Sequence, residues 1–304
     1  MKRAVALLTL LWMIVSLLSL GALAEEVDVN KNASLTLQYR HGEEVFSGLA
    51  IQTYRVAQIA PNGEMTLTGA FADYPINIEG IQCQSEWRRI ATTLASYIAA
   101  DGIAYTASGV TDAEGYVHFT NLQPGMYLTL SVRTERERTL TIFETFLTVI
   151  PHPMEDDSYL YDVTAYPKCE QKEIVPTEVT YKVVKQWKDG SYTNLRPVGV
   201  TVDILKDGVL QRQVILSSEN NWSYSWNVPD DGAKWQAVER DVADYYTVSV
   251  EEFDKTIVIT NLYDHSDLPP QAGDATTPQL YLLVTGAGGC ALLLWAVWRK
   301  RAGI

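Results

Sequence analysis

Hydrophobic and polar positions alternate over short runs through the middle of the chain, which is the pattern of half-buried β-strands. The runs are rich in Val, Thr, Tyr and Phe and are bounded by Gly, Pro and Asn. In the first half they cover residues 34–40, 48–59, 64–68, 116–120, 126–132, 139–150 and 159–166. Short strands separated by turns in this way predict a β-sandwich.

One segment of the first half follows a helical period instead. Between residue 85 and Gly102, the apolar positions recur three or four residues apart, at Trp87, Ile90, Ala91, Leu94, Tyr97 and Ile98. This spacing predicts one amphipathic helix inserted among the strands. We expect its apolar face to pack on the sheet of its own domain, and binding of a partner is the alternative use of that face.

Long apolar runs stand at both ends of the chain. The N-terminal run has the parts of a signal peptide over 1–24, with an uncleaved anchor as the alternative: Lys2 and Arg3, an apolar stretch over 4–20, then Ala22 and Ala24. Residues 279–298 carry no charge and are long enough to cross a bilayer, and the tail 299–304 is basic. These features predict an exported protein with a C-terminal transmembrane helix and a cytoplasmic tail.

Charge and histidine placement restrict the kinds of function. All 37 acidic residues lie between the two apolar ends, so the exported part is strongly acidic and nucleic acid is not an expected partner. The histidines are scattered without metal-ligand spacing, at His41, His118, His152 and His265. No order of residues indicates a Ser-His-Asp or Cys-His site, so we expect neither an enzyme nor a bound metal or cofactor.

The second half contains sequence blocks that resemble a Cna-B repeat of Gram-positive surface proteins. In chain order they are VVKQWKDG (183–190), RPVGVTVDILKDG (196–208), NNWSYSWNVP (220–229), WQAVERD (235–241) and VITNLY (258–263). In the first half, TDAEGYVHFTNLQPGMYLTL (111–130) resembles the T-D-x-x-G-x-x-x-F-x-x-L-x-x-G-x-Y-x-L stretch of the same domain type.

The resemblance implies an all-β fold of two tandem immunoglobulin-like or transthyretin-like (Cna-B-type) β-sandwich domains. The first would cover 25–170 and carry the inserted helix, and the second would cover 179–264. A polar, Pro-containing linker would join them over 171–178. The C-terminal transmembrane helix would follow.

The same resemblance implies an internal crosslink in the second domain. Many Cna-B domains join a lysine to an asparagine with the help of a buried acid, and the matching positions here are Lys185, Asn261 and Glu239. Burial would favour the neutral amine and the protonated carboxyl that such a reaction needs. The alternative is a buried Lys185–Glu239 pair, with Asn261 capping a turn. The opening strand of the first domain has Gln38 and Arg40 instead of a lysine, so we expect no such bond within 33–167.

The end of the first domain resembles the pilin motif W-x-x-x-V-x-V-Y-P-K. The matching residues are Tyr159, Val163, Ala165, Tyr166, Pro167 and Lys168, with Tyr159 for Trp and Ala165 for Val. In sortase-built pili this lysine receives the acyl group of the next subunit, which implies the same role for Lys168. An inert lysine at a strand end is the alternative.

The spacer 265–278 contains a stretch that resembles an LPXTG-type cell-wall sorting motif. The aligned pentapeptide is Pro269, Pro270, Gln271, Ala272 and Gly273, so Pro replaces the family's Leu and Ala its Thr. The resemblance implies that a sortase cleaves after Ala272 and transfers the chain to an amine of peptidoglycan or of another pilin subunit. An ordinary single-span membrane protein is the alternative.

Together these patterns predict a cell-surface structural or adhesive protein, anchored to the cell wall and similar to a pilin subunit. The alternative is a monomeric adhesin that binds a host or matrix ligand. Cys83 and Cys169 are the exported cysteines, and an oxidising exterior would permit a disulfide between them.

Overall fold

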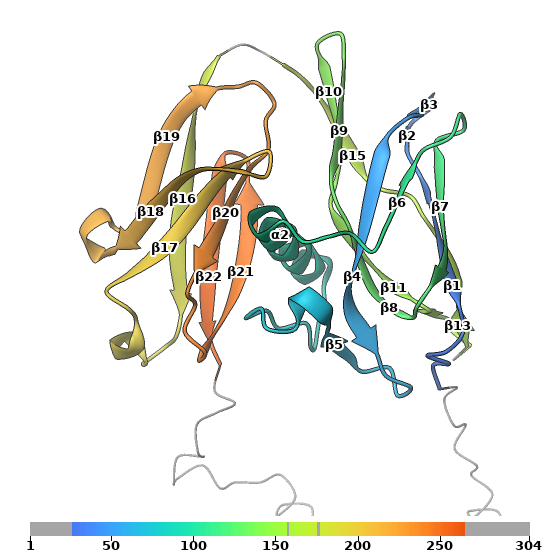
Figure 1. Ribbon diagram of the computed structural model, residues 1–304. Helices are drawn as coiled ribbons and strands as arrows, with labels where there is room; N and C mark the ends of the chain where they lie inside the picture. Colours follow the sequence, from blue (N-terminus) through green and yellow to red (C-terminus); the bar gives the residue numbers. More distant parts are fainter. Residues whose placement is uncertain (1–25, 157, 175–176, 265–304) are drawn as a thin grey trace, which may run out of the picture. The chain divides into compact units, whose positions relative to one another are not determined.

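The computed structural model describes residues 26–156, 158–174 and 177–264, which are mostly β-sheet (Figure 1). The described residues up to Tyr263 belong to one compact unit. The predicted signal peptide, sorting motif, transmembrane segment and basic tail lie outside the described residues. Within the described ranges, no helix combines the length and the apolar character needed to span a membrane.

The N-terminal half contains two main sheets that face each other across a core. One has the order β14-β1-β7, built from Asp162–Ala165, Ala33–Gln38 and Tyr116–Leu122. The other has the order β11-β8-β4-β5, built from Phe146–Ile150, Gly125–Thr129, Ala50–Ile59 and Met65–Leu67, and β6 (Ala107–Val110) also pairs with β4. β1 shows why the strands form: Leu35, Leu37 and Tyr39 are buried, while the residues between them are partly exposed.

Smaller sheets complete this half. The first has the order β15-β10-β9, built from Cys169–Glu173, Thr139–Phe143 and Val132–Arg136. Two-stranded pairs form between β2 (Arg40–His41) and β3 (Glu44–Val45), and between β12 (His152–Pro153) and β13 (Tyr159–Leu160). The short 3-10 turn η1 covers Gly69–Phe71.

The structure differs from the sequence-based expectation at several places in this half, and the run 159–166, for example, divides into β13 and β14 of different sheets. The run 139–150 is not one strand, because it divides into β10 and β11, which join different sheets. The start of the predicted linker 171–178 belongs to β15, which pairs antiparallel with β10. The polar sequence of β15 lacks an alternating pattern, and its strand conformation comes from hydrogen bonding to β10.

The C-terminal half consists of two sheets with one shared core. The four-stranded sheet has the order β19-β16-β22-β21, built from Ser223–Pro229, Glu178–Lys188, Thr256–Tyr263 and Tyr246–Phe253. The three-stranded sheet has the order β18-β17-β20, built from Val209–Ser217, Gly199–Lys206 and Trp235–Arg240. The short turns η2 (Thr193–Leu195) and η3 (Ser218–Asn220) lie between strands. The first and last strands, β16 and β22, are parallel neighbours, with Lys185 opposite Ile259.

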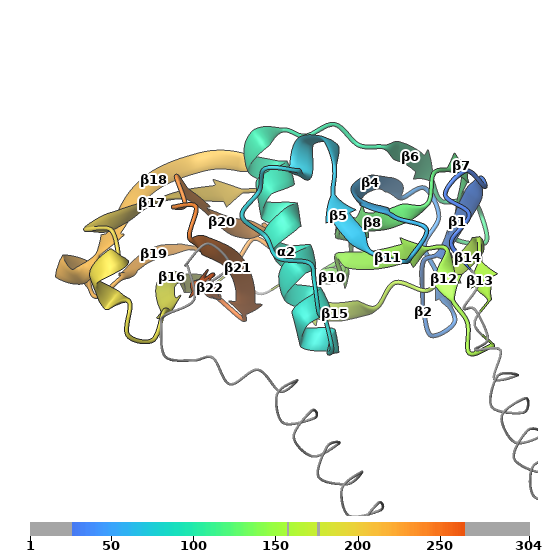
Figure 2. The same cartoon turned by 90° about the horizontal axis from the view of Figure 1, so that it is seen from below.

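The predicted helix is present as α2 (Gln84–Asp101). At its N-terminus the Glu86 carboxylate accepts from the backbone N–H of Cys83 at 3.3 Å, and at its C-terminus Gly102 has a left-handed φ of 63°. The expectation that α2 packs on its own sheet is incomplete. The helix contacts β11 and β8 of the N-terminal half, but also β21 and β20 of the C-terminal half (Figure 2).

Candidate crosslink and linkage sites

Three strands of the C-terminal half bring Lys185, Glu239 and Asn261 together in the core. Lys185 is on β16, Glu239 on β20 and Asn261 on β22, so the group joins the two facing sheets. The Lys185 side chain is 0% exposed and that of Glu239 is 1% exposed, and Asn261 is equally buried. On β16 the buried position of Lys185 follows the strand period of two, whereas β20 and β22 are buried at consecutive positions around Glu239 and Asn261.

The Glu239 carboxyl group lies between the other two side chains. Its Oε2 is 3.6 Å from Nζ of Lys185, and its Oε1 accepts a hydrogen bond of 2.8 Å from Nδ2 of Asn261. Nζ of Lys185 also donates to the backbone carbonyl of Gln186 at 2.9 Å. Oε2 of Glu239 and Oδ1 of Asn261 are buried without a hydrogen-bond partner. The carboxyl therefore contacts both the amine and the carboxamide nitrogen.

Burial moves both ionisable groups toward their neutral forms. Desolvation lowers the pKa of Lys185 to about 8, although the nearby Glu239 charge opposes that change. Desolvation also raises the pKa of Glu239, against the opposing effect of Lys185. Because the neutral amine is the nucleophilic form and a protonated carboxyl can donate, both shifts favour amide chemistry.

Aromatic and charged neighbours that the sequence reasoning did not identify surround the amine. Nζ of Lys185 lies 4.0 Å from the ring centre of Trp187, and the Arg196 guanidinium lies 5.6 Å from the same ring. Asp189, which is also buried, accepts two hydrogen bonds from Arg196 and one from the Tyr246 hydroxyl. The available signal was the strand period, since Lys185 and Trp187 alternate on β16 and Asp189 continues the same spacing just after the strand ends.

The corresponding opening strand of the N-terminal half presents no lysine to its core. Leu37 on β1 and Tyr39 just after this strand are buried, whereas Gln38 is half-buried and Arg40 is exposed. The prediction had placed Gln38 and Arg40 at the lysine position. The strand period instead makes Leu37 and Tyr39 the inward residues, and neither can supply an amine.

Lys168 is exposed in the segment between β14 and β15. Its backbone carbonyl accepts from the N–H of Glu144 at 2.9 Å, which holds the main chain at this position. Pro167 before it is buried, and Tyr166 is 64% exposed. The amine therefore stands in solvent on an anchored segment, apart from the buried Lys185.

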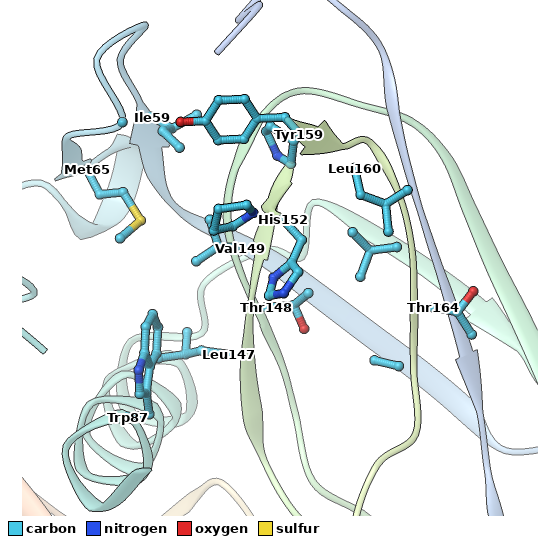
Figure 3. A pocket seen from close by; sticks show the side chains of 15 residues that line it. Ile59, Met65, Trp87, Leu147, Thr148, Val149, His152, Tyr159, Leu160 and Thr164 are labelled. Atoms are coloured by element: carbon cyan, nitrogen blue, oxygen red, sulfur yellow. The ribbon is translucent and has the colours of Figure 1, made fainter. Parts of the chain in front are cut away.

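An apolar groove of about 690 Å³ borders the strand that leads to Lys168. Figure 3 shows Trp87 of α2, Leu147 and Val149 of β11, and the hairpin residues His152 and Tyr159 around it. The groove also includes the β14 residues 163–165. His152 and Tyr159 are the only titratable side chains among its lining residues.

Cys83 and Cys169 are free thiols in the structure, so the permitted disulfide between them is not formed there. Cys83 is exposed immediately before α2, whereas Cys169 is half-buried at the start of β15. Sγ of Cys169 lies 3.2 Å from Nδ1 of His41. Burial and the charges of Glu44 and Glu144 raise the pKa of Cys169. Among the described residues, no group of three or more His, Cys, Asp or Glu is placed to hold a metal ion.

Comparison with known proteins finds a family match within the C-terminal half. Residues 181–262 match the family model of the Cna protein B-type domain. The collagen adhesin of Staphylococcus aureus is 31% identical over 96 residues, which are 29% of this chain and 8% of that protein. The chain therefore spans a small part of that relative's length.

Solved structures with detectable similarity include a single B repeat unit of the collagen-binding surface protein Cna of Staphylococcus aureus. It is 14% identical, with a TM-score of 0.27, over 77% of this chain and 98% of that one. The major pilin SpaD of Corynebacterium diphtheriae is 12% identical, with a TM-score of 0.30, over 78% and 99% of the chains. The sequence match covers the strands that carry Lys185, Glu239 and Asn261. Residues 181–262 of this chain are therefore similar in sequence to a Cna protein B-type domain.

Proposed function

We propose that this chain is a structural or adhesive protein of a Gram-positive cell surface, stabilised by a covalent Lys185–Asn261 bond. The observation that carries the crosslink is the position of the Glu239 carboxyl between the Lys185 amine and the Asn261 carboxamide nitrogen. The Cna B-type match and the collagen adhesin relative support the surface role.

The geometry supports one assignment of the proton transfers to the two oxygens of the Glu239 carboxyl. The neutral Nζ of Lys185 attacks the side-chain carbonyl carbon of Asn261, and the bond from that carbon to Nδ2 breaks. Oε2 of Glu239 faces the amine and accepts its proton, while Oε1 faces Nδ2 and delivers a proton to the leaving nitrogen. Ammonia leaves, an amide joins β16 to β22, and Glu239, which starts protonated on Oε1, ends protonated on Oε2.

The crosslink would have a mechanical consequence for a surface protein. β16 and β22 are the first and last strands of the Cna B-type domain, and they are hydrogen-bonded neighbours in one sheet. A covalent bond between them lets tension pass from one end of the domain to the other without unfolding the strands between.

Lys168 is the proposed acceptor for linkage to another subunit. Its exposure meets the requirement that an enzyme-bound acyl group can reach the amine. The apolar groove beside residues 163–165 offers a surface for an incoming chain close to that acceptor. Transfer of the Ala272 acyl group of one subunit to Lys168 of the next by a sortase would join unlike surfaces and so produce an open filament.

The second candidate function is a monomeric adhesin anchored to the wall or membrane. The collagen adhesin relative is the observation in its favour. Wall extracts separate the two candidates, because a linked subunit produces a ladder of high-mass species and a monomeric adhesin does not. Release of protein ending at Ala272 by wall-digesting enzymes would show sortase anchoring.

The crosslink itself is tested by intact mass. The exported chain, residues 25–264, should be lighter than its sequence mass by one ammonia. Glu239→Ala should restore the full mass, because Nζ of Lys185 then has no group to pass its proton to the leaving nitrogen. A full sequence mass in the unaltered chain would contradict the crosslink.

A further inference from the structure

Helix α2 belongs in sequence to the N-terminal half, yet it covers two strand edges of the Cna B-type domain. β20 ends one sheet of that domain and β21 ends the other. The helix contacts both of these strands and also the adjoining strand β17. Figures 1 and 2 both show α2 directly beside β20 and β21.

The burial of α2 shows that it is packed on more than one side. Consecutive residues from Thr93 to Ile98 are all buried. Since successive helical residues are about 100° apart, six in a row surround the helix axis and cannot lie on one stripe. A helix that covered only its own sheet would leave part of this stretch in water.

Buried polar contacts join α2 to both edge strands at this boundary. The Thr93 hydroxyl oxygen accepts a buried hydrogen bond of 2.8 Å from the N–H of Val250 on β21. The Gln236 side chain on β20 donates to the backbone carbonyl of Ala95 at 3.2 Å, also in a buried position. Leaving the buried Val250 N–H unpaired would destabilise this contact between helix and strand.

Tyr97 connects the helix to the crosslink acid itself. Its hydroxyl donates to the backbone carbonyl of Glu239 at 3.4 Å in a buried position. The Glu239 side chain points the other way, toward Lys185 and Asn261. The two groups interact electrostatically, because the Glu239 charge contributes to the raised pKa of Tyr97 after the larger effect of burial.

The burial of β20 agrees with this arrangement. The strand is buried at every position from Trp235 to Glu239, and only Arg240 is partly exposed. A strand at the edge of an open sandwich normally alternates between buried and exposed residues. Arg240 extends the boundary, since its guanidinium donates to Asp101 of α2 at 2.6 Å. The outward face of β20 is therefore dry because α2 covers it.

We propose that α2 forms part of the crosslink site. In this proposal Tyr97 is a positioning residue, which fixes the strand that carries Glu239 and keeps water away from it. The inference rests on the crosslink proposed above. It implies that docking of the N-terminal half precedes bond formation, so that a chain with an undocked N-terminal half stays uncrosslinked longer.

The test compares two tyrosine variants in the exported chain, residues 25–264. Tyr97→Phe removes the hydroxyl at the boundary and keeps the ring. Tyr127→Phe is the matched control, because the Tyr127 hydroxyl also donates to a backbone carbonyl, that of Gln123 at 2.7 Å, but within the N-terminal half. Protein is made in a cell-free system, stopped in acid at intervals, and scored by intact mass for loss of ammonia at several pH values.

Tyr97→Phe should slow ammonia loss by roughly threefold to tenfold, the effect expected from one buried hydrogen bond. The alkaline limb of its pH profile should move to lower pH, because water beside Glu239 stabilises the ionised carboxylate. Thr93→Val removes the acceptor of the Val250 N–H, and it should also slow ammonia loss relative to the unaltered chain. Tyr127→Phe should match the unaltered chain in rate and in pH profile.

Unchanged kinetics in both Tyr97→Phe and Thr93→Val would overturn the role of α2. Equal slowing by Tyr97→Phe and Tyr127→Phe, without a change of pH profile, would also overturn it, because the effect would then be a general loss of stability. Failure of the crosslink proposal is distinguishable, since the unaltered chain would then lose no ammonia in any sample, and the role of α2 would fall with it.

Discussion

Lys185→Met isolates the stabilising effect of the proposed crosslink. Methionine has a similar length and an apolar end, so it fills the buried site without leaving an unpaired ammonium group. Glu239 keeps its 2.8 Å hydrogen bond from Asn261, and burial raises its pKa and so favours its uncharged form. The variant therefore loses the covalent bond and little else.

The magnitude follows from the length of the closed loop. A bond between Lys185 and Asn261 closes a loop of about 77 residues, and the chain-entropy treatment of crosslinks assigns such a loop on the order of 4 kcal/mol. For a protein of this size, 1 kcal/mol corresponds to roughly 2–4 °C in Tm, so Lys185→Met should lower Tm by about 8–16 °C.

Thermal unfolding followed by circular dichroism, with intact mass on the same samples, measures this effect. Lys182→Met is the matched control, since Lys182 is exposed on the same strand three residues earlier, and it should change Tm by no more than a degree or two. Equal changes in Tm for the two variants would refute the reasoning, as would an unaltered chain with its full sequence mass.

Three further predictions concern other parts of the chain. Ammonia loss should slow at both ends of the pH range, because low pH protonates the Lys185 amine, whose pKa burial lowers to about 8, and high pH ionises the Glu239 carboxyl; a rate that rises steadily with pH would contradict this. Lys168→Arg should abolish branched peptides in digests of wall material, since arginine keeps the charge but supplies no neutral amine, whereas Lys172→Arg should leave them intact. Gly115→Ala should lower the free energy of unfolding, measured in urea, by about 1–3 kcal/mol more than Gly42→Ala does. Both glycines have positive φ, but a methyl group on Gly115 would lie 2.7 Å from a backbone oxygen, whereas one on Gly42 would meet open space.

Local patterns in the sequence were enough to predict most elements of secondary structure. The helix at 84–101 was predicted because its apolar positions follow the helical period and Gly102 can adopt the left-handed φ that ends it. The β-rich character followed from alternation, which is clear in β1 and β16. The resemblance of the C-terminal blocks to a Cna-B repeat was confirmed over 181–262. The resemblance of 111–130 stays a prediction.

Part of the crosslink site was also predictable. The blocks identified Lys185, Glu239 and Asn261, and the structure brings these three residues together. The blocks contained no information on which carboxyl oxygen faces which group. That geometry depends on the spacing of two sheets, and it emerges only when β16, β20 and β22 pack on one core.

Other features depended on partners that are distant in sequence. Residues 171–173 of β15 were taken for the start of a linker, because these polar residues become part of a strand only through pairing with β10. The expected lysine position in the N-terminal half was assigned to Gln38 and Arg40, because one residue of register decides which side of a strand is buried. Docking of α2 on β20 and β21 could not be read from its amphipathic pattern, since that pattern shows that a helix has an apolar face but not which surfaces it covers. The sequence by itself therefore determined most local elements and the residue types of the proposed crosslink, whereas tertiary packing decided the register, the sheet partners and the burial of Glu239 beneath a helix of the other half.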